Sequence, residues 1–427
     1  MSKRVDNRKC SSEKDILKVF ASRFSNISDF SVETGNKVSY QSEARIFDIV
    51  VNYGNQPIAI AEIKNHKDHE QELKNYLRHQ LEYYRNKESI KYFFSIEGGK
   101  FYSYDSEKED LVGKSEKEVF EMIIKSMYEQ SEVCDELIEP IRNRIEKNDK
   151  WDVYKDKLLE HIKTGSLRKI GTTVFLDEKL EKKLMHELLW MNVNSNEKKY
   201  CRYTSAKSFY LSLKNDFRLM DVENMNDELE TKVIDDYQNL KRERCNLSNY
   251  VYNGFIMCFS KMSRFDKLFN WYMYGDRAKG VCFAIEAKEQ KGEDYFFAPV
   301  NYISKNDEDI NLLSFLNDLM GLEFYDNYKF VLRFWHYWKF FFKYDYYNEE
   351  DEVRLLIIQK EEGEIEWSED LNMPYHFISK KYDELPFIIK DVVLGPKRSN
   401  PDNLISYIRE DTDISCTILE SEIKGYR

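Results

Sequence analysis

Two short apolar runs near the N-terminus each carry one acidic residue, and they constrain the fold of this chain more than any other feature. Residues 45–65 read RIFDIVVNYGNQPIAIAEIKN, with Asp48 in the first run and Glu62 in the second. Apolar runs rich in β-branched residues, split by the turn-forming YGNQ, predict a β-hairpin with strands over 46–52 and 57–64. The hairpin therefore places one acid on each of two neighbouring strands.

Pairing across this hairpin brings the two acids together. A register that sets Tyr53 opposite Pro57 also sets Asp48 opposite Glu62, and Lys64 then shares the face of Glu62. Directly opposed carboxylates destabilise a strand pair unless a cation lies between them. Oxygen ligands suit Mg²⁺ or Mn²⁺, and a nearby lysine would assist an attacking water or stabilise a phosphate. The pattern predicts a site for metal-assisted hydrolysis; the alternative is a surface hairpin whose acids pair with lysines.

A polar residue interrupts the apolar stripe of the helix predicted over 68–86. Gln80 lies on the stripe formed by Leu73, Leu77, Leu81 and Tyr84. Because a buried amide is costly unless it is hydrogen-bonded, we expect Gln80 to face the carboxylate–lysine cluster. Tyr84, one turn further on, would be its neighbour.

The order of these residues resembles the PD-(D/E)xK nuclease superfamily, and more narrowly the N-terminal nuclease domain of type I restriction enzyme R subunits. The resemblance covers about residues 11–115 and is carried by Arg45, Asp48, Pro57, Glu62, Lys64, Gln80 and Tyr84. It implies that Asp48 and Glu62 bind the metal and that Lys64 is the catalytic lysine.

The same resemblance implies roles for three further residues. Gln80 and Tyr84 would contact DNA or orient the site, and Glu13 stands where such domains carry an acid near the start of their first helix. R subunits continue into helicase motifs, whereas this chain has no G-x-x-x-x-G-K-[ST] phosphate loop. ATP-driven translocation is therefore not expected.

The chain as a whole is expected to be α/β (α+β) with three parts. Residues 1–115 form the restriction-endonuclease-like domain, 116–195 a helical connector, and 196–427 a mixed α+β domain that acts as a sensor or second effector. In this last part the runs NGFIMCFS, GVCFAIEA, VRLLIIQ and IIKDVVLG are rich in β-branched residues and predict strands.

The C-terminal part resembles a bacterial domain family of unknown function, through CRYTS, NMNDELE, CFS, NWYMYGDRAKGVCFAIE, EEDEVRLL and VVLGPK in that order. Within it, Arg202, Ser260, Glu350 and Glu352 are similar to the arginine–serine–glutamate arrangement of ADP-ribosyltransferases. That likeness implies NAD as a cofactor bound by these four residues. The alternative is that Glu350, Glu352 and Arg354 form an ion network within the chain.

Aromatic residues are dense in the same part of the sequence. Trp271, Tyr272, Tyr274, Trp335 and Trp338 would allow base stacking in a sensor that binds a nucleotide or a phage product. They also fit an ordinary core, which we favour.

Charge and cysteine content limit the classes of protein to which this chain could belong. The net charge of −12 argues against a generally basic nucleic-acid-coating surface, but a local basic groove is compatible with it. Seven scattered cysteines without metal-binding spacing indicate reduced thiols. The N-terminus carries no apolar signal segment, and no run is apolar enough for a membrane span, so we expect a cytoplasmic protein with no membrane contact.

These patterns predict a Mg²⁺- or Mn²⁺-dependent endonuclease that cuts DNA in bacterial defence against phage or foreign DNA. Its expected partners are DNA, an activating ligand or phage-derived trigger, and further copies of the chain. Two alternatives remain: an NAD-using ADP-ribosyltransferase-like toxin with a DNA-binding N-terminal domain, and a non-catalytic DNA-binding sensor.

Overall fold

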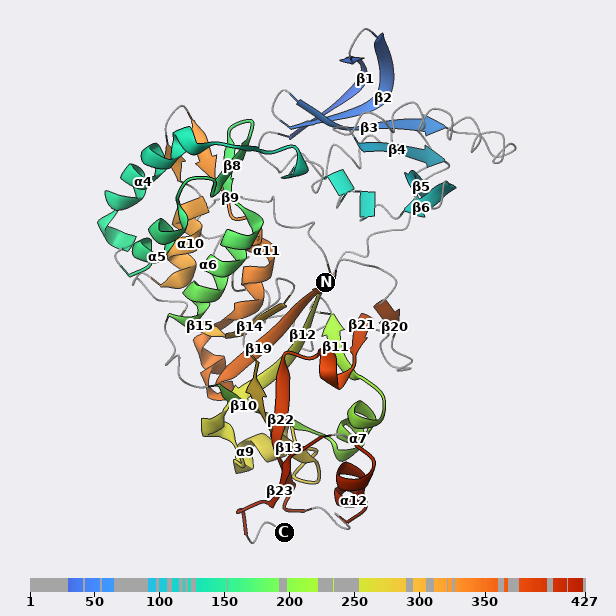
Figure 1. Cartoon of the computed structure of the whole chain (residues 1–427), viewed down its shortest axis with the longest axis vertical. Helices are drawn as coiled ribbons and strands as arrows, with labels where there is room; N and C mark the ends of the chain where they lie inside the picture. The colour runs from blue at the N-terminus through green and yellow to red at the C-terminus, as the bar shows by residue number, and fades with distance from the viewer. Residues whose placement is uncertain are drawn as a thin grey trace. The chain divides into compact units, whose positions relative to one another are not determined.

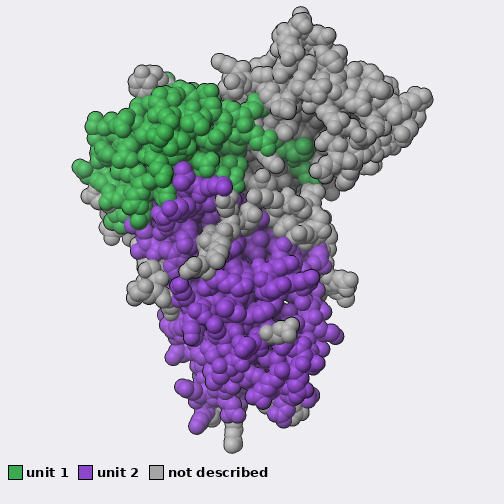
Figure 2. Space-filling model, viewed as in Figure 1, with its two compact units in different colours: residues 1–178, 241–251, 316–336 green, residues 179–240, 252–315, 337–427 purple. Residues whose placement is uncertain are grey.

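The computed structural model describes the chain from residue 30, with gaps. The described residues are 30–40, 43–53, 56–64, 91–96, 100–105, 110–114, 118–119, 122–123, 128–151, 153–191, 198–221, 233, 253–288, 295–304, 311–320, 322–324, 327–359, 365–367, 376–397, 402–412 and 414–424. They form a mixed α/β protein, as the sequence predicts, in two compact units (Figure 2). Unit 1 holds Met1–Glu178, Lys241–Val251 and Leu316–His336, and unit 2 holds Lys179–Leu240, Tyr252–Phe315 and Tyr337–Arg427.

The first sheet of unit 1 contains both acid-bearing strands (Figure 1). Its strands, in sheet order, are β1 (Phe30–Tyr40), β2 (Glu43–Tyr53), β3 (Gln56–Lys64), β4 (Lys91–Ile96), β5 (Lys100–Asp105) and β6 (Asp110–Lys114). Neighbours are antiparallel except β3 and β4, which run parallel. Parallel neighbours need a crossover connection, and the residues between these two strands, 65–90, lie outside the described ranges. Strands β4 and β5 form an antiparallel hairpin.

A second sheet in unit 1 lies partly in the range that was expected to be a helical connector. Its strands, in sheet order, are β16 (Glu323–Phe324), β17 (Tyr328–Phe330), β9 (Thr173–Leu176), β8 (Leu167–Ile170) and β7 (Glu132–Val133). Helices α4 (Ile138–Glu146) and α5 (Lys155–His161) belong to the same range.

The expectation of a connector made of helices therefore holds only in part. Ile170 pairs with Thr173 across a two-residue turn, and Gly171 at the first turn position has φ of 54°. That positive φ suits the turns that join hairpin strands. The strands are four residues long, too short for their alternation to stand out in the sequence.

Unit 2 is built on a ten-stranded sheet (Figure 1). Its main path runs through β20 (Ile365–Trp367), β21 (His376–Lys380), β11 (Phe217–Asp221), β12 (Asn253–Lys261), β10 (Lys199–Thr204), β13 (Val281–Ala287), β22 (Phe387–Leu394) and β23 (Thr417–Glu420). Strand β19 (Glu352–Gln359) pairs with β12 and with β14 (Tyr295–Pro299). The four strands predicted in this part of the sequence, β12, β13, β19 and β22, are confirmed.

Shorter elements complete the described chain. A two-stranded parallel sheet joins β15 (Asn301–Ile303) and β18 (Phe342–Tyr344). The helices are α6 (Glu178–Trp190), α7 (Ala206–Lys214), α9 (Leu268–Met273), α10 (Leu312–Met320), α11 (Trp335–Trp338) and α12 (Asp402–Glu410), and the short 3₁₀ segments include η4 (Met262–Arg264) and η6 (Asp345–Glu350).

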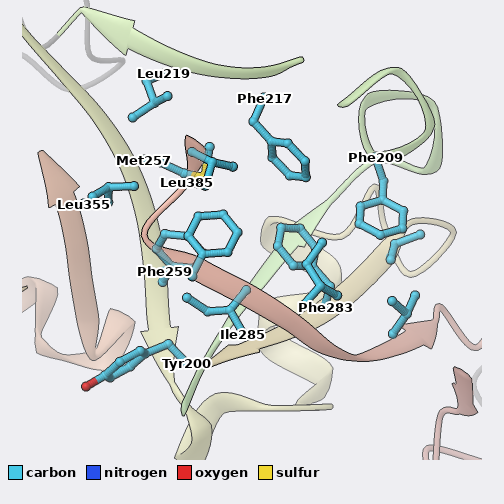
Figure 3. Close-up of a cluster of buried hydrophobic side chains, with 14 of the residues drawn as sticks. Tyr200, Phe209, Phe217, Leu219, Met257, Phe259, Phe283, Ile285, Leu355 and Leu385 are labelled. Atoms are coloured by element: carbon cyan, nitrogen blue, oxygen red, sulfur yellow. The ribbon is translucent and has the colours of Figure 1, made fainter. Parts of the chain in front are cut away.

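The main core of unit 2 covers one face of the large sheet, beneath α7 and α12. Figure 3 shows Phe209 of α7 beside Phe283 of β13, with ring centroids 5.1 Å apart. Tyr210 and Tyr407 join the two helices at 4.7 Å. On the other face, Trp271 of α9 is fully buried with Tyr203, Cys201 and Cys282. Because side chains alternate along a strand, neighbouring residues of β10 serve both clusters.

Two further expectations concern the cysteines and membrane-spanning segments. The five cysteines that the structure describes, Cys134, Cys201, Cys258, Cys282 and Cys416, are free thiols, as predicted. In the described ranges no helix is long and apolar enough to cross a membrane.

Candidate functional site

Asp48 and Glu62 lie on the neighbouring antiparallel strands β2 and β3. Ile49 pairs with Ala61, and the pairing continues in the same register toward the turn. Continued by one residue in the other direction, this register would place Asp48 opposite Glu62. This is the register that the sequence predicts for the middle of the hairpin.

The end of the hairpin departs from the prediction. The register shifts between Val51 and Asn52, so that Asn52 pairs with Pro57, and Tyr53 pairs with Gln56 rather than with Pro57. A β-bulge puts two residues of one strand against one of the other. The loop is thereby one residue shorter than expected, while the pairs from Ile49–Ala61 to Val51–Ala59 keep the predicted register.

The backbone places these positions within a sheet that is covered on both faces. Val50, which shares the face of Asp48 by alternation, is 2% exposed, and Val51 and Ala59 on the opposite face are each 1% exposed. Lys64 is two residues after Glu62 and therefore occupies the same face.

Three predicted site residues lie outside the described residues. In the sequence, Glu13 precedes β1, and Gln80 and Tyr84 lie between β3 and β4. Their predicted roles stay predictions.

The C-terminal candidate residues surround a buried carboxylate. Ser260 of β12 stands directly opposite Glu352 of β19. The Glu352 carboxylate accepts hydrogen bonds from Arg354 Nε at 2.8 Å and Arg354 NH2 at 3.0 Å. Its Oε2 also lies 2.8 Å from Lys343 Nζ. Since Arg354 is fully buried and Lys343 is 2% exposed, this carboxylate is held by two cations away from water.

Glu350 extends the network to the surface. Its Oε2 lies 2.6 Å from Lys343 Nζ, and Tyr274 Oη donates to its Oε1 at 3.1 Å. Arg354 further donates to the Phe340 carbonyl at 2.7 Å. Two carboxylates and two cations therefore balance one another, an arrangement that satisfies buried charges.

Arg202 has a different contact from the other predicted NAD-binding residues. Its NH1 donates to the Cys258 carbonyl at 2.5 Å. The same edge of β12 pairs with β11 through Phe255 and with β10 through Ser260. Cys258 lies between these two pairings, so its carbonyl has no strand partner on that side, and the Arg202 guanidinium satisfies it.

The protonation states follow from this burial. Burial acts to raise the pKa of Glu352, but the charges of Arg354 and Lys343 outweigh it and lower the pKa to about 2. Burial raises the pKa of the neighbouring Cys258 thiol and Tyr302 phenol. Glu352 is therefore ionised at neutral pH, while the Cys258 thiol and the Tyr302 phenol beside it are neutral.

These contacts agree with the interpretation in which Glu350, Glu352 and Arg354 form an ion network within the chain. Ser260 and Glu352 are brought together, as an NAD site would need, but the Glu352 carboxylate is taken up by two cations. Sequence reasoning missed Lys343, the second of them. It stands within the aromatic run FFKYDYY, and a lone lysine there was the available signal.

The aromatic residues divide between core and surface. Trp271, Trp335 and Trp338 are buried, as expected for a core, but Tyr272 is 54% exposed and Tyr274 is 42% exposed. Only the two tyrosines of this set could stack on a ligand.

Comparisons of this chain with protein family models, with curated proteins and with solved structures find no match. Among the described residues, no group of three His, Cys, Asp or Glu could hold a metal ion.

Proposed function

We propose that this protein is a metal-dependent endonuclease that hydrolyses DNA phosphodiester bonds at a site formed by Asp48, Glu62 and Lys64. The observation that supports the proposal is the β2–β3 register at Ile49–Ala61, which would place Asp48 opposite Glu62 if it continued by one residue. The sequence resemblance to PD-(D/E)xK nucleases, with a restriction-endonuclease-like domain as the inferred fold, adds to it.

Each residue type fits a part of the reaction. The carboxylates of Asp48 and Glu62 are the hard oxygen donors that Mg²⁺ or Mn²⁺ prefers. When bound, such a cation supplies Lewis acidity and an activated water. Lys64 places positive charge near the phosphate as negative charge develops there. Gln80 and Tyr84 orient the site from the crossover.

The biological setting is inferred from architecture. A nuclease joined to a sensing or effector module, without a motor, fits intracellular bacterial defence against phage or foreign DNA. In this proposal unit 2 receives the trigger that licenses cleavage.

The NAD alternative has less support. The pairing of Ser260 with Glu352 favours it, but Glu352 is neutralised by Arg354 and Lys343. Arg202 is engaged by a main-chain carbonyl. Those contacts leave neither side chain open to a dinucleotide.

Plasmid cleavage tests the nuclease proposal. Supercoiled DNA is incubated with the full chain in Mg²⁺, Mn²⁺ or EDTA, beside Lys64→Ala and the control Lys114→Ala. Lys114 lies on the same sheet but on the edge strand β6. We expect metal-dependent cutting that Lys64→Ala reduces by about 10²- to 10⁴-fold, with Lys114→Ala near wild type. Cutting in EDTA, or a wild-type rate for Lys64→Ala, would refute the assignment.

A further inference from the structure

A row of positions across β3, β4 and β5 has a lysine at each end (Figure 1). Lys64 of β3 pairs with Ile96 of β4, and Ile96 pairs in turn with Lys100 of β5. Directly paired residues share a face of the sheet, so both lysines occupy the face of Glu62. Neighbouring strands are about 4.8 Å apart, which puts the two lysine positions about 10 Å from each other.

Strand β1 adds a third lysine to this face. Lys37 pairs with Ile46 of β2. Val50 shares the face of Ile46 by alternation and pairs with Ile60 of β3, so Lys37 occupies the same face as Lys64. Continued as far as Lys64, the β2–β3 register would put Ile46 opposite it and complete one row from β1 to β5. We call Lys37, Lys64 and Lys100 the lysine row.

The acids of this face occupy other rows. Asp48 is two residues from Ile46, and Glu62 is two residues from Lys64. Glu33 of β1 is four residues from the lysine of its own strand. In the six described strands of this sheet, no other acid occupies the face. The lysines and acids are therefore equal in number but separated along the strands, with the expected metal ligands in the row next to the lysines.

The backbone beside Asp48 carries no side chain on the β1 side. The pairs that flank Gly35 keep one register, so Gly35 takes the β1 position opposite Asp48. A glycine inside a strand often marks a place where a ligand approaches the backbone closely. The buried Val50 is four residues from Ile46, about 13 Å along β2. Its burial therefore does not extend by itself to the lysine row.

We propose that the lysine row binds successive phosphates of the DNA strand that is cut, so that this strand crosses β1 to β5 with its scissile phosphate at Lys64. A phosphodiester backbone repeats its charge along its length, as the lysine row does across the sheet, and lysines neutralise phosphates as point charges. Lys37 and Lys100 position the strand on either side of the reacting bond. This inference rests on the proposed nuclease function, whose substrate it takes.

The test measures binding apart from cleavage. Anisotropy of a dye-labelled DNA duplex is followed with the full chain in EDTA over a range of salt concentrations. The variants are Lys37→Gln, Lys100→Gln and the two combined. Lys91→Gln is the control, because Lys91 pairs with Ala59 on the opposite face of the sheet. Urea unfolding midpoints equal to wild type show that the variants keep the fold.

The salt dependence reports how many phosphates are neutralised. Each contact with duplex DNA contributes about 0.9 to the slope of log affinity against log salt. We expect each single variant to lower the slope by about 0.9 and the double variant by about 1.8. Lys37→Arg and Lys100→Arg keep the charge and should restore the slope, with Lys91→Gln at wild type. In plasmid cleavage the glutamine variants should raise KM and leave kcat unchanged.

Four results would overturn the proposal. They are a wild-type slope in the glutamine variants, an equal fall in Lys91→Gln, no DNA binding by the wild type, and tighter binding of an RNA duplex of the same sequence. Metal-dependent cutting with unchanged slopes would overturn this inference alone. Lowered slopes in a protein that does not cut would support the lysine row and overturn the nuclease proposal.

Discussion

Glu352 and Arg354, two residues apart on β19, form a side-by-side ion pair whose two hydrogen bonds measure 2.8 and 3.0 Å. Both side chains lie on the face of β19 opposite the main core, since Val353 between them belongs to that core. Lys343 reaches the same carboxylate from β18. One carboxylate therefore joins two separate strands of unit 2.

Replacing Glu352 by glutamine should destabilise unit 2. The variant leaves Arg354 and Lys343 buried with their main counter-charge removed, which typically costs about 3–5 kcal/mol. Urea unfolding followed by circular dichroism measures the change. The control is Glu286→Gln, because Glu286 pairs with Lys390 on the surface and such pairs contribute little. Equal midpoints for the two variants would contradict the account of the buried network.

The same network predicts acid sensitivity. The pKa of Glu352 is lowered from 4.5 to about 2 in the folded chain, so the unfolded chain binds the extra proton. This contribution to stability is therefore complete above about pH 4.5 and is lost as pH falls toward 2, by on the order of 3 kcal/mol.

Unfolding free energies of the wild type and Glu352→Gln, compared from neutral pH to about pH 3, test this sign. We expect the difference between the two chains to narrow as the pH falls below 4.5. A difference that widens or stays constant would show that Glu352 is not the titrating group.

Gly280→Ala should destabilise the end of the sheet that carries α9. The new methyl would lie 2.2 Å from the Thr204 carbonyl oxygen and 2.8 Å from that of Gly275, and main-chain atoms cannot move aside freely. We expect a loss of about 1–3 kcal/mol in unfolding free energy. Gly113→Ala is the control, since its methyl would meet only Tyr102 at 3.9 Å. An unchanged midpoint for Gly280→Ala would contradict the close packing.

The sequence predicted the elements whose signal is local. Strands β2, β3, β12, β13, β19 and β22 are long runs with apolar and β-branched residues, so their periodicity identifies them without knowledge of their partners. Strand β9, by contrast, pairs on one side with β17, far along the chain. Four-residue strands stabilised by distant pairing carry too little local pattern, which is why the connector was expected to be helical.

The two candidate sites also contain features that the local sequence predicts and features that depend on distant parts of the chain. The register of β2 with β3 from Ile49–Ala61 to Val51–Ala59 follows from alternation, which a hairpin sequence contains. The hydrogen bond from Arg202 to the Cys258 carbonyl does not follow from the local sequence. It depends on the change of strand partner along β12, from β11 to β10, beside Cys258. No local pattern reports which carbonyl a sheet leaves unpaired.

The most direct test of the nuclease proposal is to count Mn²⁺ ions bound by the full chain in a titration followed by electron paramagnetic resonance. The chains compared are wild type, Asp48→Asn, Glu62→Gln and the control Glu43→Gln, which changes another acid of β2. If Asp48 and Glu62 hold one cation between them, each single variant should lose the same tight Mn²⁺ site and lose plasmid cleavage with it, while the control keeps both. Retention of that site in either variant, or cleavage that survives its loss, would contradict the proposal.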